Sequence, residues 1–174
     1  MTEDWVMTDP NPDPTLDRLL RHMAWANSAL IAQLAGLTDE ALAFASPRNE
    51  WSVARILAHL VSAAGGYASR LEGVPRPPDT EPPTSVAQLA VILARCAAFD
   101  SRLRAQATLP DVLIAHPHPE RPARARSTIL GQAIHHATEH RAQIAGALST
   151  NGLDAIDLDA LDLWAYGEVE GLGA

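Results

Sequence analysis

The 174-residue sequence has no lysine, a single cysteine and few aromatic residues, which make up 5% of the chain. Without lysine, the protein cannot form a Schiff base through a side-chain amine or supply the lysine of a phosphate-binding P-loop. The one cysteine, Cys96, excludes an internal disulfide and a metal site built from cysteines alone. This sparing use of cysteine agrees with a reducing compartment.

Long apolar runs are also missing. The longest stretch without a charged side chain, residues 23–38, is short and contains several polar side chains, so we expect no membrane helix. The first ten residues are acidic and lack the basic and apolar regions of a secretory signal. Together these features predict a cytoplasmic protein.

Acidic residues outnumber basic ones by 21 to 13, which gives a formal net charge of −8. Such a charge repels the phosphates of nucleic acids and of anionic lipids, so neither a nucleic acid nor a membrane is expected as a partner. All 13 cations are arginine, and together with the many alanines this indicates a GC-rich bacterial coding sequence.

The length and the 47% hydrophobic content predict one globular domain with a single core. Residues 1–13, which are acidic and contain prolines, are expected to form a flexible N-terminal tail, and residues 14–174 the domain. Asp13 is placed to cap a helix that Pro14 opens. We interpret Gly152 as a left-handed signal at the end of the last long helix.

Apolar residues at helical spacing predict four long helices, each about 20 residues and therefore about 30 Å long. The expected segments are 14–36, 53–72, a helix that opens near Thr84 or Ser85 with Gln88 in a capping box, and 127–151. A short amphipathic piece is expected within 157–170. The proline-rich segment 108–125 has room for an extended stretch at 112–115, but no strand pair is predicted. The predicted fold is an all-α four-helix bundle.

Three of the seven histidines fall in the stretch HHATEHRAQI. His136 and His140 are four residues apart and therefore share a helix face, about 6 Å apart along the axis, where two imidazoles can hold one cation. His135 points to the opposite face. His59 lies at the edge of the apolar arc of the second helix. These residues are either boundary histidines with ordinary hydrogen bonds or ligands of one metal ion.

Several short motifs resemble those of the DinB-like family over most of the chain. They are WAN at 25–27, WSV…HL within 51–60, HxxxHRxQ from His136 to Gln143, and LDLWAYGE at 161–168. The usual glycine of the HRGQ form is replaced by Ala142. The resemblance implies a four-helix bundle, often dimeric, that binds one divalent metal ion, commonly nickel or zinc. The positions that match the family's ligands are His59, His136 and His140.

Three neutral imidazoles without a fourth protein ligand describe an open metal site, in which water or substrate takes the remaining position. A metal there can ionise bound water or a thiol. Some DinB-like proteins transfer or isomerise substrates with bacillithiol, mycothiol or glutathione. The resemblance therefore implies a small-molecule substrate and transfer of a low-molecular-weight thiol, or a related hydrolysis. The alternative is a non-catalytic bundle whose metal site is structural or serves partner binding.

The string from His136 to His140 also fits the HxxEH pattern of inverzincin proteases, with Glu139 as general base. That interpretation needs a third ligand, and only Glu168 and Glu170 follow downstream. In a DinB-like site, Glu139 is the candidate catalytic base, and otherwise it is an ordinary solvated carboxylate. The ExxH pairs of di-iron bundles are missing from the sequence.

Four further side chains fall at informative positions of the predicted helices. Arg141 lies on the apolar arc, so we expect it to pair with a carboxylate or a carbonyl. Asn27 lies on a core stripe and is expected to bond a neighbouring helix end. Trp25 points away from that stripe, toward a dimer face, the rim of the site or solvent. Cys96 lies on a core face and is interpreted as inert packing.

Overall fold

The computed structural model describes residues 13–46 and 50–172, and most of the predicted tail, residues 1–12, lies outside them. The described elements are α1 Pro14–Ala35, η1 Asp39–Ala43, α2 Val53–Glu72, η2 Val86–Gln88, α3 Leu89–Gln106, β1 Leu113–Ile114, β2 Arg124–Ala125, α4 Arg126–Thr150, η3 Asp159–Leu161 and α5 Leu163–Val169. The prediction of an all-α bundle is confirmed. Within the described residues, no helix is both long and apolar enough to span a bilayer.

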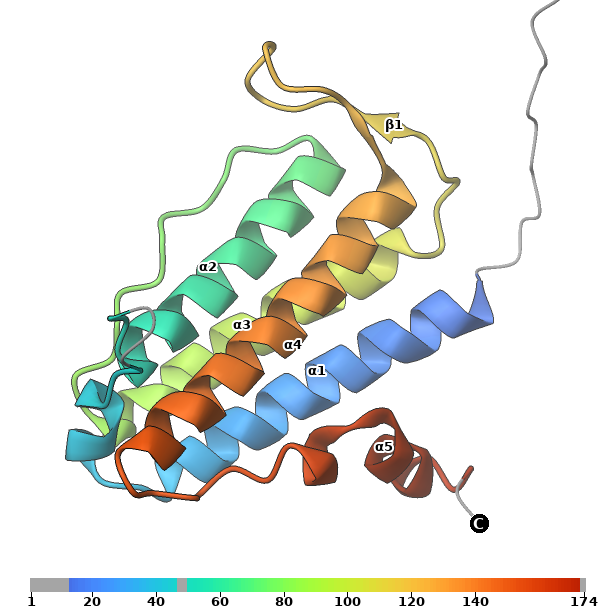
Figure 1. Cartoon of the computed structure of the whole chain (residues 1–174). Helices are drawn as coiled ribbons and strands as arrows, with labels where there is room; N and C mark the ends of the chain where they lie inside the picture. Colours follow the sequence, from blue (N-terminus) through green and yellow to red (C-terminus); the bar gives the residue numbers. More distant parts are fainter. Residues whose placement is uncertain (1–12, 47–49, 173–174) are drawn as a thin grey trace, which may run out of the picture.

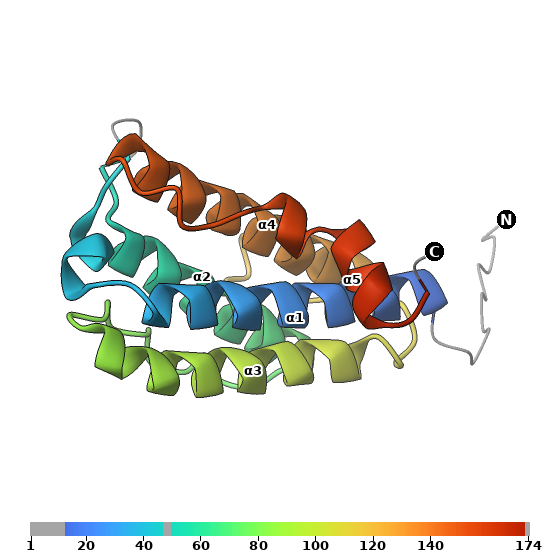
Figure 2. The ribbon, with the colours of Figure 1, turned by 90° about the horizontal axis from the view of Figure 1, so that it is seen from below.

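The four long helices pack in pairs, with α1 against α3 and α2 against α4 (Figures 1 and 2). The segment between α2 and α3 runs back along the bundle, so α2 and α3 point in the same direction (Figure 1). Such a long crossover connection is one of the known ways to join a four-helix bundle. It places α2 and α4 side by side, although 53 residues separate Glu72 from Arg126.

Helix ends follow the predicted capping residues. The Asp13 side chain accepts a hydrogen bond from the backbone N–H of Thr15 at 2.8 Å, and Pro14 occupies the first helical position. Gly73, which was not predicted as a cap, ends α2 with a φ of 68°, in the left-handed region that favours glycine. The backbone N–H of Thr84 donates to Gln88 Oε1 at 2.7 Å, which is one half of the expected capping box.

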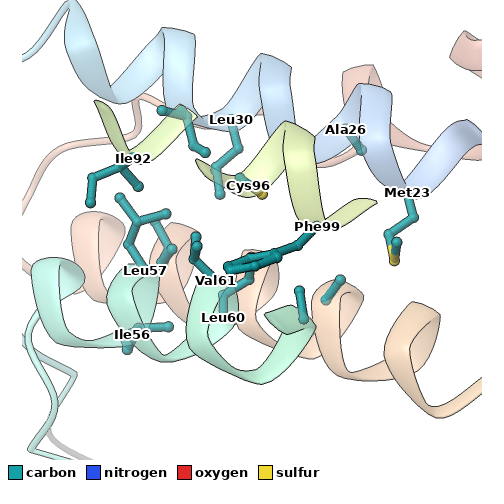
Figure 3. Close-up of a cluster of buried hydrophobic side chains, with 14 of the residues drawn as sticks. Met23, Ala26, Leu30, Ile56, Leu57, Leu60, Val61, Ile92, Cys96 and Phe99 are labelled. Atoms are coloured by element: carbon teal, nitrogen blue, oxygen red, sulfur yellow. The ribbon is translucent and has the colours of Figure 1, made fainter. Parts of the chain in front are cut away.

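The core lies between all four long helices and is built mainly from leucine, isoleucine and alanine (Figure 3). Phe99 reaches from α3 toward α2, where Gly65 leaves room for its ring. A Cβ atom at Gly65 would lie 2.8 Å from the ring, closer than packed atoms approach. Cys96 is 1% exposed in this core, so the prediction that it packs is confirmed.

A short β-ladder precedes α4, in a segment where no strand pair is predicted. Leu113 pairs with Ala125 and Ile114 with Arg124, in antiparallel register. Each strand has only two residues, too few to give the alternating pattern by which a strand is detected in a sequence. The ladder ends where Arg126 N–H bonds the carbonyl of Val112, and α4 begins there.

The C-terminal segment returns to α1. η3 and α5 form within the range where a short amphipathic piece is predicted, and α5 lies beside α1 (Figure 2). The centroid of the Trp25 ring lies 5.3 Å from that of Tyr166, so α5 covers the face that was expected to be a dimer surface, a site rim or solvent. This contact could not be predicted from the sequence, because the loop before α5 has no periodic pattern that indicates where it leads.

Candidate metal site

Helices α2 and α4 bring His59, His136 and His140 together. One ring nitrogen from each lies within 4.8 Å of the others. The Nε2 atoms of His136 and His140 are 3.1 Å apart, close to the separation of about 3.3 Å that two ligands have on a tetrahedral zinc with Zn–N bonds of about 2.0–2.1 Å. His59 adds the third ring from the neighbouring helix, edge-on to both others. The predicted grouping of the three residues is therefore present.

The three histidines differ in how far they are buried. His140 is buried at 6% exposure, whereas His59 and His136 are half-buried. Burial is the largest cause that lowers the pKa of His136, to about 4, and the neighbouring His140 and His59 lower it further. Burial also lowers the pKa of His59, with His140 as the next cause. At neutral pH both rings are therefore uncharged, and a neutral imidazole is the form that binds a metal.

Gln143 fixes the tautomer of His140. Its Oε1 lies 2.8 Å from His140 Nδ1, and an amide oxygen can only accept a hydrogen bond, so Nδ1 carries the proton. The lone pair of Nε2 then faces His136. The Gln143 amide nitrogen donates to Glu139 Oε1 at 3.4 Å, which keeps the amide oxygen turned toward the histidine. Hydrogen bonds of this kind orient metal-ligating histidines in known sites.

Glu139 is exposed on α4. Its carboxylate accepts the hydrogen bond from Gln143, so it helps to orient a ligand. The inverzincin interpretation lacks its third ligand, because the metal-capable group found among residues 13–46 and 50–172 consists of histidines alone. Glu170 instead pairs with Arg18 and Arg21, and Glu168 is exposed on α5.

Two aromatic side chains flank the histidines, and the sequence pattern did not single them out for the site. Trp51 contacts His59 edge-on with ring centroids 5.1 Å apart, and the Arg55 guanidinium lies 4.6 Å from the centroid of the Trp51 ring. Tyr67 meets His136 with ring centroids 5.8 Å apart. Tyr67 lies eight residues after His59, about two turns along the same helix, which is the signal that could have found it.

The DinB family model matches residues 7–168. The chain belongs to the DinB family. Its fold is similar to the crystal structure of a DinB family member from Shewanella denitrificans, with a TM-score of 0.54 and 18% sequence identity. The alignment covers 85% of this chain and 88% of that one. A search of curated proteins gives no match. The positions that the DinB resemblance assigned as ligands are the three histidines that the fold brings together.

Two residues of the DinB-like motifs, Asn27 and Arg141, meet in the core. Arg141 donates to Asn27 Oδ1 at 2.8 Å and to Thr138 Oγ1 at 3.0 Å. The expected partner is thus present as the side-chain carbonyl of Asn27, and the Thr138 hydroxyl is a second acceptor. Asn27 in turn donates to Asp100 Oδ2 at 3.1 Å, so it bonds the middle of α3 and α4 and no helix end. Burial lowers the pKa of Arg141 to about 10 and raises that of Asp100.

The remaining histidine of the HHATEH stretch and the cysteine stand outside the site. His135 is exposed and absent from the group of ligands, as its helix phase predicted. Burial raises the pKa of the Cys96 thiol well above its usual range. A buried thiol that stays protonated is unreactive, which supports its interpretation as packing.

Proposed function

We propose that this DinB family protein binds one divalent metal ion, nickel or zinc, through His59, His136 and His140. The observation that carries the proposal is the convergence of the three ring nitrogens within 4.8 Å from two different helices. Imidazole nitrogens suit both metals. The hydrogen bond from His140 Nδ1 to Gln143 and the lowered pKa of His136 prepare the ligands for a cation at neutral pH.

We further propose that the reaction is transfer of a low-molecular-weight thiol to an electrophile, or a related hydrolysis. A divalent ion held by three imidazoles lowers the pKa of a coordinated water or thiol, which supplies the nucleophile. The protein's own groups orient the site: Gln143 holds His140, and Trp51 and Tyr67 contact the rings of His59 and His136. Glu139, exposed beside Gln143, stays the candidate base.

Access to the site favours an enzyme over a purely structural ion. His59 and His136 are half-buried, and a small pocket lined by His136 and Tyr67 adjoins the cluster. A structural site is usually closed by four protein ligands, whereas the group found in the described part of the chain has three. An open coordination position beside half-buried ligands is what a substrate or a thiol requires.

Metal content of untagged protein, measured by mass spectrometry after reconstitution with zinc or nickel, tests the first proposal. We expect about one equivalent in the wild type and a loss of most of it in His59→Ala. His135→Ala is the matched control and should keep the metal, because His135 lies next to a ligand but is exposed outside the group. Equal loss in both variants, or no metal in the wild type, would overturn the proposal.

Cobalt substitution tests the second proposal separately. A thiol that enters the coordination of cobalt adds a sulfur-to-metal charge-transfer band, which a water does not. We expect this band when a small thiol is added to the cobalt protein, and its absence in His59→Ala. Cys96→Ser should behave as the wild type, since Cys96 is buried in the core. A spectrum that no thiol alters would reject thiol transfer and leave hydrolysis or a structural ion.

A further inference from the structure

A small internal pocket adjoins the histidine cluster and extends from it toward the core. His136, Tyr67, Asn27 and Asp100 line it together with apolar side chains, among them Met23 and Leu103. The pocket has room for about one group of the size of a water molecule. The carboxyl group in its lining is that of Asp100, from α3.

Asp100 is an unusual residue in the lining of this pocket, because an acidic side chain is rarely buried and this one is only 2% exposed. Its Oδ2 atom accepts hydrogen bonds from Asn27 Nδ2 at 3.1 Å and from Cys96 Sγ at 3.5 Å. Its Oδ1 atom has no hydrogen-bond partner among the described residues. A buried carboxylate oxygen without a donor is costly, and such an atom in a native structure calls for a missing partner.

The charges around Asp100 indicate what that partner is. The nearest cation, Arg141, donates to Asn27 and Thr138 and acts on the carboxylate only through space. The two direct donors to Asp100, an amide and a thiol, are uncharged. No lysine exists in the chain to supply an ammonium group. The pocket is therefore lined by a carboxyl group whose Oδ1 atom no cationic donor of the described residues contacts.

We propose that this pocket binds a primary ammonium group of the substrate, with Asp100 Oδ1 as its hydrogen-bond acceptor. The proposal rests on the proposed function in one respect: it names the chemical class of the substrate for the histidine site. Because His136 lines the pocket and also belongs to the cluster, an ammonium group seated at Asp100 places the rest of the molecule toward the three histidines. An amine-bearing thiol or an amine-bearing electrophile fits both features.

The test uses metal-free protein, so it does not depend on the metal proposal. Met23 lines the pocket, and the methyl group of a methionine labelled with carbon-13 is a sensitive NMR probe. We expect methylammonium chloride to shift the Met23 signal in a saturable way, with a midpoint in the millimolar range or above because the ligand is very small. Sodium chloride at the same ionic strength should produce no saturable shift. Tetramethylammonium should fail as well, because it is too large and has no N–H donor.

Variants locate the binding. Asp100→Asn keeps the shape but removes the charge, and it should abolish the saturable shift. Asp79→Asn removes an exposed carboxylate elsewhere and should leave the shift unchanged. If Asp100→Asn does not fold, the comparison of methylammonium with tetramethylammonium on the wild type still decides the question. No saturable shift in the wild type, or equal shifts with all three salts, would overturn the proposal and leave the pocket to water.

Zinc binding, measured on the same samples, separates this proposal from the previous one. Zinc binding without methylammonium binding would support the metal site and reject the ammonium pocket. Methylammonium binding without zinc binding would support the ammonium pocket and reject the proposed metal chemistry. The Asp100→Asn variant should bind zinc as tightly as the wild type, because Asp100 is not among the ligands.

Discussion

Gln143 is the side chain whose effect on the metal site can be measured most directly. Gln143→Leu removes the acceptor of His140 Nδ1–H while leaving all three ligands in place. We expect zinc affinity to fall by roughly 10- to 100-fold, as is typical when the hydrogen-bond partner of a ligating histidine is lost. Competition with a chelating dye measures this.

A conservative variant separates orientation from packing. In Gln143→Glu a carboxylate still accepts the hydrogen bond from His140, so zinc affinity should stay within a few-fold of the wild type. If Gln143→Leu binds zinc as tightly as the wild type, the Gln143 contact does not orient the ligand.

His22 gives the fold a dependence on pH. Burial lowers the pKa of His22 below its ordinary value of 6.5, and its Nε2 donates to the carbonyl oxygen of Leu161 at 2.8 Å. Below about pH 6.5 the unfolded chain therefore binds a proton that the native state resists, and the free energy of unfolding falls as the pH falls. Urea denaturation of metal-free protein at pH 7.5 and 5.5 measures this loss.

The variant His22→Gln keeps an N–H donor for Leu161 but cannot titrate. Its loss of stability between the two pH values should be smaller than that of the wild type. His135→Gln, at an exposed position on α4, should lose as much as the wild type. A wild-type loss that His22→Gln leaves unchanged would assign the pH dependence to other groups, such as His59 and His136.

Residues of the site differ in how much the sequence reveals about them. The spacing of four between His136 and His140 is enough to place them on one helix face, and the family motif supplies His59. Asp100 could not be found in this way, because its partner Asn27 lies 73 residues away and a single aspartate within an apolar helix carries no periodic signal. Long-range partners of isolated polar residues depend on how helices pack.

At the scale of the helix, two adjacent glycines of α2 should respond to substitution in opposite directions. Gly65→Ala would place a Cβ 2.8 Å from the Phe99 ring, and overpacking of this kind typically costs about 1–3 kcal/mol. At Gly66 the nearest atoms belong to the Arg76 guanidinium at 3.6 Å, which is ordinary contact. Gly66→Ala should therefore raise stability by up to about 1 kcal/mol through helix propensity.

Thermal and urea unfolding of both variants measure the difference. A loss of stability in both variants would mean that a Cβ at Gly66 has less space in solution than the distances in the structure indicate. A gain in both would mean that Phe99 moves aside at little cost.

The long helices are predicted well, and the short β-ladder is not. Asp13 with Pro14 is a local signal that acts within one turn, so the start of α1 follows from the sequence. The β1–β2 ladder has no local signal of this kind. Asp111 accepts from the backbone and side chain of Ser127, 16 residues later, so the start of α4 is tied to a distant loop.

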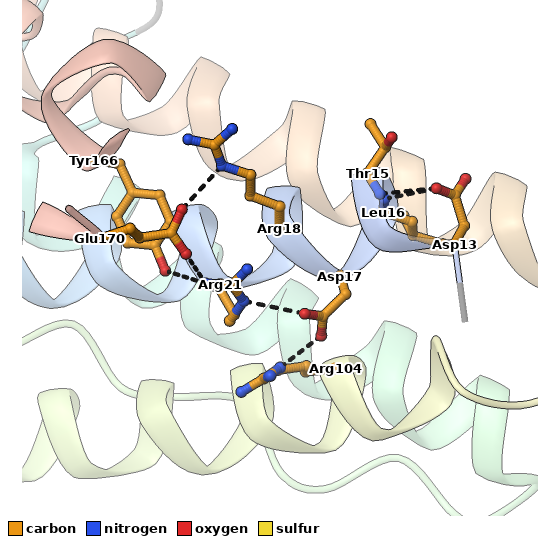
Figure 4. A network of polar contacts seen from close by, with 9 residues as sticks. All are labelled: Asp13, Thr15, Leu16, Asp17, Arg18, Arg21, Arg104, Tyr166 and Glu170. Atoms are coloured by element: carbon orange, nitrogen blue, oxygen red, sulfur yellow. Dashed lines mark hydrogen bonds and ion pairs between the residues drawn. The ribbon is translucent and has the colours of Figure 1, made fainter. Parts of the chain in front are cut away.

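At the scale of the whole molecule, one carboxylate helps to hold the C-terminal segment to α1. Glu170 pairs with Arg18 at 2.9 Å and with Arg21, and its side chain is 10% exposed (Figure 4). Arg21 also bonds Asp17, which Arg104 of α3 contacts in turn. We expect Glu170→Gln to cost about 1 kcal/mol, and thus about 2–4 °C in Tm.

Glu168→Gln is the matched control in the same C-terminal segment. Glu168 is exposed, so its neutral variant should leave Tm nearly unchanged. The effect of Glu170→Gln should shrink at high salt, because partly exposed ion pairs are screened. A Tm that Glu170→Gln does not lower at any salt concentration would mean that packing of Tyr166 on Trp25 holds α5 by itself.

The division of the proposed ligands between helices, two on α4 and one on α2, would have a kinetic consequence. A brief separation of α2 from α4 removes His59 but leaves His136 and His140 four residues apart on an intact helix, where they can still hold a cation weakly. Departure of a bound ion would then take two steps, and recapture would compete with escape after the first. The residence time of the metal would therefore report how often, and for how long, these two helices part.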